Sequence, residues 1–480
     1  MKGKIDISAL ACVIMGLIFI LFPSVNNTSD SLSFASSVRD GEELFRHHHL
    51  LYNPLVYILT LTFGISDTIS FMCCMNALFA VGCLFLMRSM LLSFTDSKIT
   101  GILIIFLGSC FGFIRFATDA EAYIVPLFFA LSGSCTLLLK RKIFFTSFLL
   151  AVACLFHQLY FFWWIGLYVL IFRFFFNDRL RYFLFYASAA CIVPLVYIIV
   201  FYTTEHDCNN ILEFIFHDYI KYDYVDISFK PVTLILTPIS FFRTFVQVHG
   251  YFLPLLQKYV WLFIPVSFSV VLFIIACFNL KGFVRKKTDV TDFDNIFAQA
   301  HLIIFFLQFL FAAFSDGNAE FMYMLPFAGT LYLFINYRIR LKTFFYLTIA
   351  LFLWNFSLAI YPSHFLQLGS EKSMAKYVSE NDTEIYYLQN KVLVHNIMSY
   401  YYSDIKVQLY SMERKDDLDS LISVNGSVIT NITGNKTTLS RAAFVFRADK
   451  KIEEKYKIEE KASISYDLGT LNIVKLSKKN

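Results

Sequence analysis

The chain has 480 residues, of which 57% are hydrophobic and 19% aromatic, while only 16% are charged. Soluble globular domains are about half apolar and a quarter charged, so this composition excludes a protein that is soluble over its whole length. The formal net charge of +5 gives no basis for nucleic-acid binding. The sequence therefore predicts an α-helical polytopic membrane protein.

Charges are unevenly distributed along the chain. Positions 371–480 hold 17 Lys and Arg and 15 Asp and Glu, which leaves 24 and 21 for the first 361 residues. This split predicts a transmembrane domain at 1–361 and a soluble domain at 362–480. Nine of the ten cysteines lie in or beside apolar segments. A disulfide framework is therefore not expected, and no metal-ligand cysteine spacing is evident.

About eleven apolar segments are long enough to cross a hydrocarbon core of roughly 30 Å. They run approximately over 7–23, 68–90, 99–117, 122–139, 143–158, 159–176, 183–203, 255–280, 296–314, 321–336 and 343–361. We interpret the first as a retained span, because more spans follow and no small-residue cleavage site is evident. The shorter apolar segment 51–63 contains Asn53-Pro54 and is interpreted as an interfacial or re-entrant helix on the outer side.

The positive charges give the orientation. With the amino terminus inside, inner connections contain 17 of the 24 Lys and Arg in the first 361 residues. Cytoplasmic loops carry such an excess, so we expect the amino terminus in the cytoplasm and the second domain outside. The outer loops would then be 24–67 and 204–254. The mixture of aromatic and charged residues in 204–254 suggests helices lying on the membrane surface.

The first outer loop holds the densest group of ionisable residues between apolar spans. Such groups lose hydration at a membrane surface unless they have partners or a water-filled cavity, so we interpret 24–67 as a catalytic or binding loop. An ordinary solvated connector is the alternative. Asp30 is the candidate general base, since a carboxylate near the membrane plane can reach an acceptor hydroxyl. The alternative is that Asp30 caps a helix at Ser31–Val38.

A second acidic position follows the third span. Asp119 and Glu121 are candidate catalytic residues in the outer turn ATDAEAY. Arg115 precedes Asp119 by four residues, so the two can pair if the helix continues. That pairing leaves Glu121 unexplained, which favours a function. Glu320, in the short outer turn SDGNAE, is a candidate for substrate binding.

Histidines supply the other candidate binding groups. Adjacent residues diverge on a helix and alternate on a strand, so at most two of His47–His49 can face one site. We therefore favour hydrogen bonding to substrate by His48 and His49 over a zinc site, and leave the metal open. His157 and His249 are assigned the same role, with satisfied core histidines as the alternative.

The second domain alternates strand-like with helix-like runs, which predicts a small α/β domain. The strand-like runs are EIYYL, IKVQLY, SVITNI and LNIVKL, and the helix-like runs are HNIMSYYY and KDDLDSLIS. The run KKIEEKYKIEEKA at 450–462 is interpreted as a solvated charged face rather than a binding patch.

These features together resemble one enzyme superfamily. An inner amino terminus, an acidic loop after the first span, HHHLLYNPLVY before the second span, ATDAEAY and an outer carboxy-terminal domain are similar to the GT-C superfamily of polyprenyl-phosphate-sugar-dependent glycosyltransferases. The resemblance implies that Asp30 activates the acceptor or helps to bind a metal, with a second acidic position at Asp119 or Glu121. The first loop lacks the Asp-Glu pair of protein O-mannosyltransferases at Asp30.

The resulting hypothesis is a membrane glycosyltransferase, a hexosyl- or pentosyltransferase of the plasma (inner) membrane. It would transfer sugar from a polyprenyl-phosphate donor to a lipid-linked or cell-envelope acceptor on the outer face. Arg243, with His249 or a first-loop histidine, would stabilise the leaving phosphate. No cofactor is certain, and a divalent cation is left open. The alternative is a glycolipid transporter or flippase, although no convincing internal repeat is found.

Overall fold

A computed structural model describes residues 6–174, 178–220, 231–248, 250–279, 284–285, 291–338, 340–411, 418–431 and 450–479. The chain divides into two compact units. The first unit consists of 1–23, 41–247 and 265–359, and the second of 24–40, 248–264 and 360–480. Each unit is described separately.

The first unit is built from helices. In chain order these are α1 (Ile7–Leu21), α3 (Tyr52–Phe63), α4 (Thr68–Leu91), α5 (Ser97–Ser109), α6 (Phe111–Ala117), α7 (Ile124–Lys140), α8 (Ile143–Phe156), η1 (Gln158–Tyr160), α9 (Phe161–Phe174), α10 (Arg179–Ala190), α11 (Ile192–Thr203), α12 (Ile211–Ile215), α13 (His217–Ile220), α14 (Thr233–Phe245), α16 (Phe263–Phe278), α17 (Asp292–Phe314), η4 (Ala319–Met322), α18 (Leu325–Asn336), α19 (Leu341–Asn355) and the π-helical turn η5 (Phe356–Ile360). Two short strands, β1 (Val284–Arg285) and β2 (Tyr337–Arg338), pair antiparallel.

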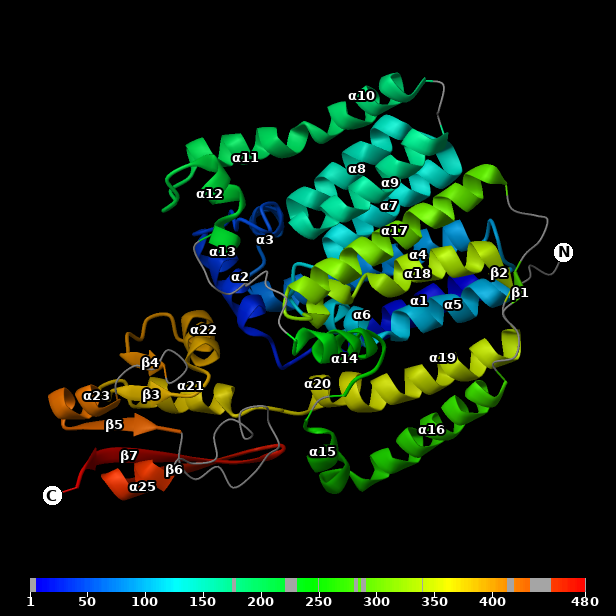
Figure 1. The fold of residues 1–480 in the computed structure, drawn as a ribbon. Coiled ribbons are helices and arrows are strands. Elements are labelled where there is room, and N and C mark those ends of the chain that lie inside the picture. The colour runs from blue at the N-terminus through cyan, green and yellow to red at the C-terminus, as the bar shows by residue number, and fades with distance from the viewer. Residues whose placement is uncertain are drawn as a thin grey trace. The chain divides into compact units, whose positions relative to one another are not determined.

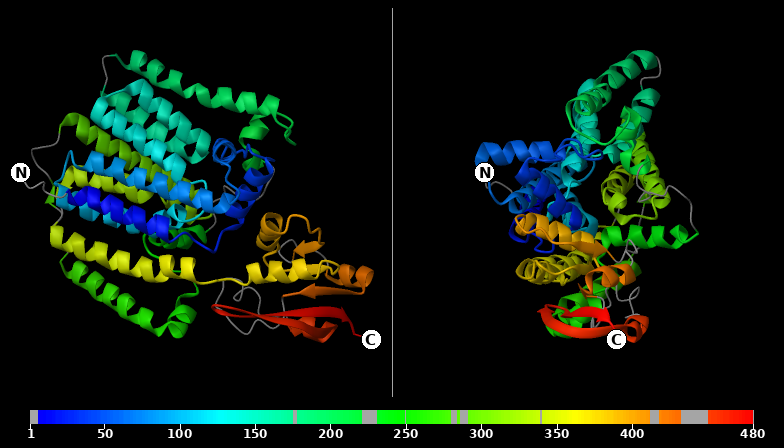
Figure 2. Two further views of the ribbon diagram at one scale, coloured as in Figure 1. Left: turned by 180° about the vertical axis from the view of Figure 1, so that it is seen from behind. Right: turned by 90° about the vertical axis from the view of Figure 1, so that its left-hand side faces the viewer.

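Most of these helices lie side by side in a bundle, with α10 and α11 along one side and α16 beside α19 (Figure 1). The view from behind shows the same neighbours (Figure 2). Within the described parts of the chain, five helices are long and apolar enough to cross a membrane, and a bent pair gives a sixth. The chain is therefore an integral multi-pass membrane protein. Each of the eleven predicted segments contains a helix, but the count of eleven spans stays a prediction.

One predicted span, 99–117, is wrong as a single helix. It breaks between α5 and α6 with a bend of 71°, because Cys110 adopts an extended backbone. The break leaves the Ser109 carbonyl without a helical partner, and Asn355 Nδ2 donates to that oxygen at 2.7 Å. Asn355 also bonds the Phe245 carbonyl at 2.6 Å and the Gln247 amide at 2.9 Å. A buried amide thus satisfies backbone groups that apolar surroundings would leave unpaired.

Helix α3 (Tyr52–Phe63) fulfils the expectation of a short helix in the apolar segment 51–63, with Asn53-Pro54 in its first turn. It ends at Gly64, whose φ of 63° places it in the left-handed region that glycine adopts without strain. Its position at the membrane interface stays a prediction.

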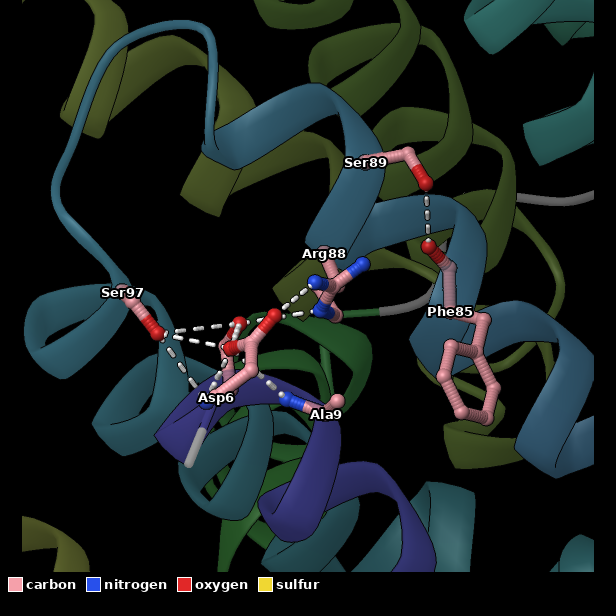
Figure 3. Close-up of polar contacts among 7 residues, drawn as sticks. Asp6, Ala9, Phe85, Arg88, Ser89 and Ser97 are labelled. Atoms are coloured by element: carbon pink, nitrogen blue, oxygen red, sulfur yellow. Dashed lines mark hydrogen bonds and ion pairs between the residues drawn. The ribbon is translucent and has the colours of Figure 1, made fainter. Parts of the chain in front are cut away.

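Asp6 joins the start of α1 to two other helices. Its Oδ1 accepts hydrogen bonds from the Ser8 amide at 3.0 Å and Ser97 Oγ at 2.7 Å, which caps the helix. Arg88 of α4 forms an ion pair with Asp6 Oδ2 and donates to Ser8 Oγ at 2.9 Å. Figure 3 shows the Arg88 and Ser97 side chains converging on the Asp6 carboxylate.

The second unit contains a five-stranded sheet with helices. Its helices are α2 (Ser29–Asp40), α15 (Phe252–Lys258), η3 (Val260–Leu262), α20 (Tyr361–Phe365), α21 (Glu371–Glu380), α22 (Lys391–Tyr401), α23 (Leu418–Asn425) and α25 (Lys450–Lys455). Its strands are β3 (Tyr386–Leu388), β4 (Leu409–Ser411), β5 (Ser427–Thr430), β6 (Tyr456–Tyr466) and β7 (Gly469–Lys478). The order is β4-β3-β5-β7-β6, parallel for β3 with β4 and β5, and antiparallel for β5 with β7 and β7 with β6.

The predicted elements of this domain are present. The four strand-like runs overlap β3, β4, β5 and β7, and the two helix-like runs overlap α22 and α23. A cluster of buried side chains forms the core beside the sheet: Tyr387, Ile422, Val428, Tyr456, Val474 and Leu476. The charged run at 450–462 forms α25 and most of the edge strand β6, whose residues 457–461 are exposed. Exposed charges of this kind keep an open sheet edge from pairing with another chain.

Helix α2 packs against α22 within the same unit. Asn396 Nδ2 donates to the Ser29 carbonyl at 2.9 Å, and Arg39 donates to the Ser399 carbonyl at 3.0 Å. Thr28 Oγ1 accepts from the Ser31 amide at 3.1 Å and so caps the helix. Asp30 lies in the first turn of α2 and is exposed. The helix predicted around Ser31–Val38 is therefore present, with a cap from Thr28.

Candidate functional site

Arg115 is at the centre of a charged cluster in the first unit. Its Nη2 lies 2.9 Å from Glu320 Oε1 and 3.9 Å from Glu121 Oε1. The Glu121 side chain is 3% exposed, while Arg115 and Glu320 are 28% and 30% exposed. Tyr123 donates from its hydroxyl to Glu320 Oε2 at 3.4 Å. We call Arg115, Glu121 and Glu320 the Arg115 cluster.

The predicted pairing of Arg115 with Asp119 required a helix that continues from one residue to the other. Arg115 forms ion pairs with Glu320 and Glu121. Helix α6 ends at Ala117, so the four-residue spacing no longer places Asp119 above Arg115. Asp119 is nonetheless buried, and its Oδ1 accepts from the Ala120 amide at 2.8 Å.

A buried amide on α4 fixes the turn that carries the two acidic residues. Asn76 Nδ2 donates to the Asp119 carbonyl at 2.8 Å and to the Glu121 carbonyl at 2.6 Å. Tyr52 of α3 donates to Asn76 Oδ1 at 3.4 Å. Asn76 was not among the residues predicted for the site, although a polar residue inside an apolar span is a signal of function or of a structural hydrogen bond.

Glu320 is positioned by a tight turn. Asp316 and Gly317 have φ of 54° and 66°, and Asn318 Oδ1 accepts from the Glu320 amide at 2.9 Å. A Cβ at Gly317 would lie 2.9 Å from the Thr237 amide nitrogen of α14. The backbone of this turn therefore approaches α14 at a distance that only glycine allows, and this contact places Glu320 toward Arg115.

Tyrosines line the cluster on its buried side. Tyr323 donates from its hydroxyl to the Tyr123 carbonyl at 2.6 Å and is hydrogen-bonded to the Tyr160 hydroxyl. The rings of Tyr123 and Phe116 have centroids 4.3 Å apart. Tyr123, Tyr160 and Tyr323 were not among the residues predicted for the site, because tyrosines in aromatic-rich apolar segments give no distinct signal.

His157 is a buried polar residue next to Tyr123. Its ring centroid is 5.1 Å from that of Tyr123 and 4.4 Å from that of His49. His157 Nδ1 accepts from the Leu159 amide at 3.3 Å, so Nε2 carries the proton in the neutral ring. Within the described part of the chain, His157 Nε2 has no hydrogen-bond partner. A buried N–H of this kind is costly unless a ligand or water accepts from it.

The three consecutive histidines point to different neighbours. His48 Nδ1 lies 3.0 Å from Gln158 Oε1, and His49 Nδ1 lies 3.3 Å from the Phe156 carbonyl oxygen. His47 instead stacks on His217, with ring centroids 4.1 Å apart. The divergence expected for adjacent residues is therefore present, and His49 is the member next to His157.

The remaining predicted residues are more dispersed. Arg243 lies on α14, which packs against α6 and η4, the elements that carry Arg115 and Glu320. His249 lies outside the described residues. Asp30 belongs to the second unit. The structure thus brings Glu121, Glu320 and Arg115 together, with His49 and His157 joined to them through Tyr123.

No protein-family model matches the sequence, and no curated protein matches it. Several solved structures are similar to the structure of this chain. The Archaeoglobus fulgidus oligosaccharyltransferase in complex with Zn and sulfate is 12% identical, with a TM-score of 0.49 over 97% of this chain and 72% of that one. ArnT from Cupriavidus metallidurans bound to undecaprenyl phosphate is 9% identical, with a TM-score of 0.45 over 98% and 97% of the two chains. The apo state of the same ArnT is 11% identical to this chain, with a TM-score of 0.42 over 98% and 97% of the two chains.

The TM-scores are below 0.5, and the assignments that follow therefore depend on this chain's own residues.

Proposed function

We propose that the protein is a membrane glycosyltransferase that uses a polyprenyl-phosphate-linked sugar. In the reaction, an acceptor hydroxyl oxygen forms a bond to the anomeric carbon while the bond from that carbon to the phosphate oxygen breaks. The acceptor proton passes to a carboxylate, and polyprenyl phosphate leaves. The acceptor is a lipid-linked or cell-envelope glycan, and the lipid supplies the activated sugar without a nucleotide.

The observation that carries this proposal is the Arg115 cluster. Two carboxylates, Glu121 and Glu320, share one guanidinium, so the cluster has more acidic than basic side chains. Glu121 is enclosed and is the candidate within this cluster to accept the proton. The exposed part of Arg115 is a donor suited to the leaving phosphate as its charge develops.

Other residues are assigned supporting roles. His157 Nε2–H would donate to a sugar hydroxyl or a phosphate oxygen, since it is a buried donor without a described partner. Arg243 would add positive charge for the phosphate. The predicted base Asp30 stays a candidate because its position on α2 is exposed. A divalent cation, if required, would bind the carboxylates of Asp119, Glu121 or Glu320.

Purified full-length protein in nanodiscs tests the proposal. It is mixed with a panel of polyprenyl-phosphate hexoses and pentoses and an envelope lipid extract, with and without EDTA, and products are identified by mass spectrometry. We expect release of polyprenyl phosphate and a new glycosidic bond. Glu121→Gln should reduce turnover at least about a hundredfold, while the exposed control Glu380→Gln should not. Equal turnover of wild type and Glu121→Gln would remove Glu121 from the mechanism.

The broken helix α5–α6 favours a second candidate, a glycolipid flippase, because transporters often bind substrate at interrupted helices. Reconstituted vesicles separate the two functions. Movement of a lipid-linked sugar across the bilayer without any new glycosidic bond would establish the flippase and exclude the transferase.

The orientation is part of the proposal and has its own test. None of the ten cysteines lies in the predicted domain at 362–480, so Lys461→Cys on β6 places a single thiol in that part of the chain. In intact cells, a membrane-impermeant maleimide should label this variant above the wild-type background. Labelling only after the cells are broken would place residues 362–480 in the cytoplasm.

A further inference from the structure

Three side chains of types that bind transition metals converge in the first unit, apart from the Arg115 cluster. One potential ligand atom each of His47, Cys208 and His217 lies within 4.8 Å of the others. His47 Nε2 is 3.9 Å from Cys208 Sγ. Cys208 and His217 are 8% and 6% exposed, so the group is nearly enclosed by protein.

The carboxylate of Asp207 offers a fourth ligand atom, an oxygen, at the same place. Its Oδ1 lies 3.6 Å from His217 Nε2 and 3.9 Å from Cys208 Sγ. Ligand atoms around a tetrahedral zinc ion are about 3.3–3.6 Å apart, given bonds of about 2.0–2.3 Å. The three distances of 3.6, 3.9 and 3.9 Å are a few tenths of an ångström above this spacing, and the ligand atoms of His47, Cys208 and His217 lie within 4.8 Å of one another, so the ligands must move closer together when an ion binds.

We propose that His47, Cys208, His217 and Asp207 form a structural zinc site. A thiolate and two imidazoles suit Zn²⁺, whereas Ca²⁺ and Mg²⁺ require oxygen ligands. Binding would release the Cys208 thiol proton to solvent, because the thiolate is the ligand. The proposal does not depend on the glycosyltransferase activity.

One adjustment is needed on binding. The rings of His47 and His217 are parallel, with an interplanar angle of 4°, and a metal lies in the plane of each imidazole that binds it. One ring must therefore turn about χ2, a torsion with broad minima. The His47 backbone stays fixed meanwhile, because Tyr197 and Gln158 donate to its carbonyl at 2.8 and 3.2 Å.

The site would tie the histidine turn at 47–49 to the segment 207–217. Helix α12 lies in that segment, and α13 begins at its last residue, His217. Hydrogen bonds already join the segment to the turn through Gln158, which also donates to the Ile215 carbonyl at 2.9 Å. A metal would add a strong cross-link next to these bonds. It would thereby limit the motion of His48 and His49, which follow His47 directly.

Full-length protein in detergent is stripped with a chelator and titrated with Zn²⁺ against a chromophoric competitor. We expect about one tightly bound zinc per chain after gel filtration, and a thiolate-to-metal charge-transfer band when Co²⁺ replaces zinc. Cys208→Ser and His217→Ala should each weaken zinc binding at least about tenfold. Cys191→Ser, which removes an exposed cysteine elsewhere, should bind as wild type does.

The wild-type measurements test the site even if a variant fails to fold. Substoichiometric zinc in the wild type, or cobalt binding without a charge-transfer band, would overturn the proposal. Equal affinity of wild type, Cys208→Ser and His217→Ala would do the same. Glycosyltransferase assays do not enter this test, so its failure leaves the proposed enzymatic function unaffected.

Discussion

Arg115 and Glu320 are 205 positions apart in the chain, yet Arg115 Nη2 donates to Glu320 Oε1 at 2.9 Å. This contact joins α6, the short second half of a broken helix, to the turn before α18. The same guanidinium is the ion-pair partner of Glu121. A single side chain therefore links two candidate residues that the sequence places far apart.

Replacing Arg115 by Gln should destabilise the protein, because it leaves the enclosed Glu121 carboxylate without its cation. Loss of one partner from a fully buried pair costs about 3–5 kcal/mol, and partial exposure of Arg115 and Glu320 lowers the expected cost to about 1–3 kcal/mol. Thermal unfolding in detergent measures it. Arg173→Gln, at an exposed hydrogen bond to Gln299, is the control. A melting temperature equal to that of the control would show that the pair is not stabilising.

Asn355→Ala should lower stability by about 3 kcal/mol or more, since two carbonyls and one amide lose their side-chain partner, each at about 1–3 kcal/mol. Asn336→Ala removes only a bond to the Tyr332 carbonyl four residues earlier, so a change within about 0.5 kcal/mol is expected. Thermal melts of both variants in the same detergent make the comparison. If the two variants melt together, Asn355 does not support the helix break.

Two glycines with positive φ separate backbone strain from crowding. The Cβ added by Gly64→Ala would have no atom within 4 Å. This variant should therefore lose only about 1–2 kcal/mol of stability, because alanine is strained at a positive φ. Gly317→Ala adds a contact at 2.9 Å to the Thr237 amide nitrogen, so we expect a further cost of about 1–3 kcal/mol. Unfolding midpoints measure the difference. Equal destabilisation by the two variants would contradict the close approach of this turn to α14.

Asp419 gives the stability of the second unit a pH dependence. Hydrogen bonds from Lys455 and Tyr456 hold the pKa of Asp419 below its usual value of about 3.9. A carboxyl group with a lowered pKa adds stability above that usual value, and the stability is lost as pH falls through the folded pKa. The protection of α23 and β6 amides from hydrogen exchange, measured relative to the intrinsic exchange rate at each pH, should therefore fall in acid less steeply in Asp419→Asn than in wild type. The exposed control Asp382→Asn should keep the wild-type slope, and identical slopes in all three proteins would refute the effect.

The sequence predicted the elements whose signal is local. The helices follow from long apolar runs, and β3, β5 and β7 follow from short runs of alternating or β-branched residues. The second half of the charged run at 450–462 was not predicted as a strand, because its residues face solvent and carry no apolar alternation. Its pairing with β7 decides its structure.

Features that depend on distant partners were not predictable. The break after Ser109 is supported by a hydrogen bond from the Asn355 side chain to the Ser109 carbonyl. The sequence around Ser109 does not show that a side chain 246 positions later supplies this bond. The partner of Arg115 is likewise decided by the turn around Gly317. The group of His47, Cys208 and His217 joins two segments about 160 positions apart in the chain, so no local cysteine or histidine spacing could indicate it.

The contact between Asp6 and Arg88 also bears on the order of membrane insertion. Asp6 precedes Arg88 by 82 residues, so the first helix leaves the ribosome well before its cationic partner on α4 has been synthesised. Until then, the Asp6 carboxylate can cap α1 only through local groups such as the Ser8 amide. Helix α1 is therefore synthesised without its final anchor, and α4 completes that anchor when it arrives.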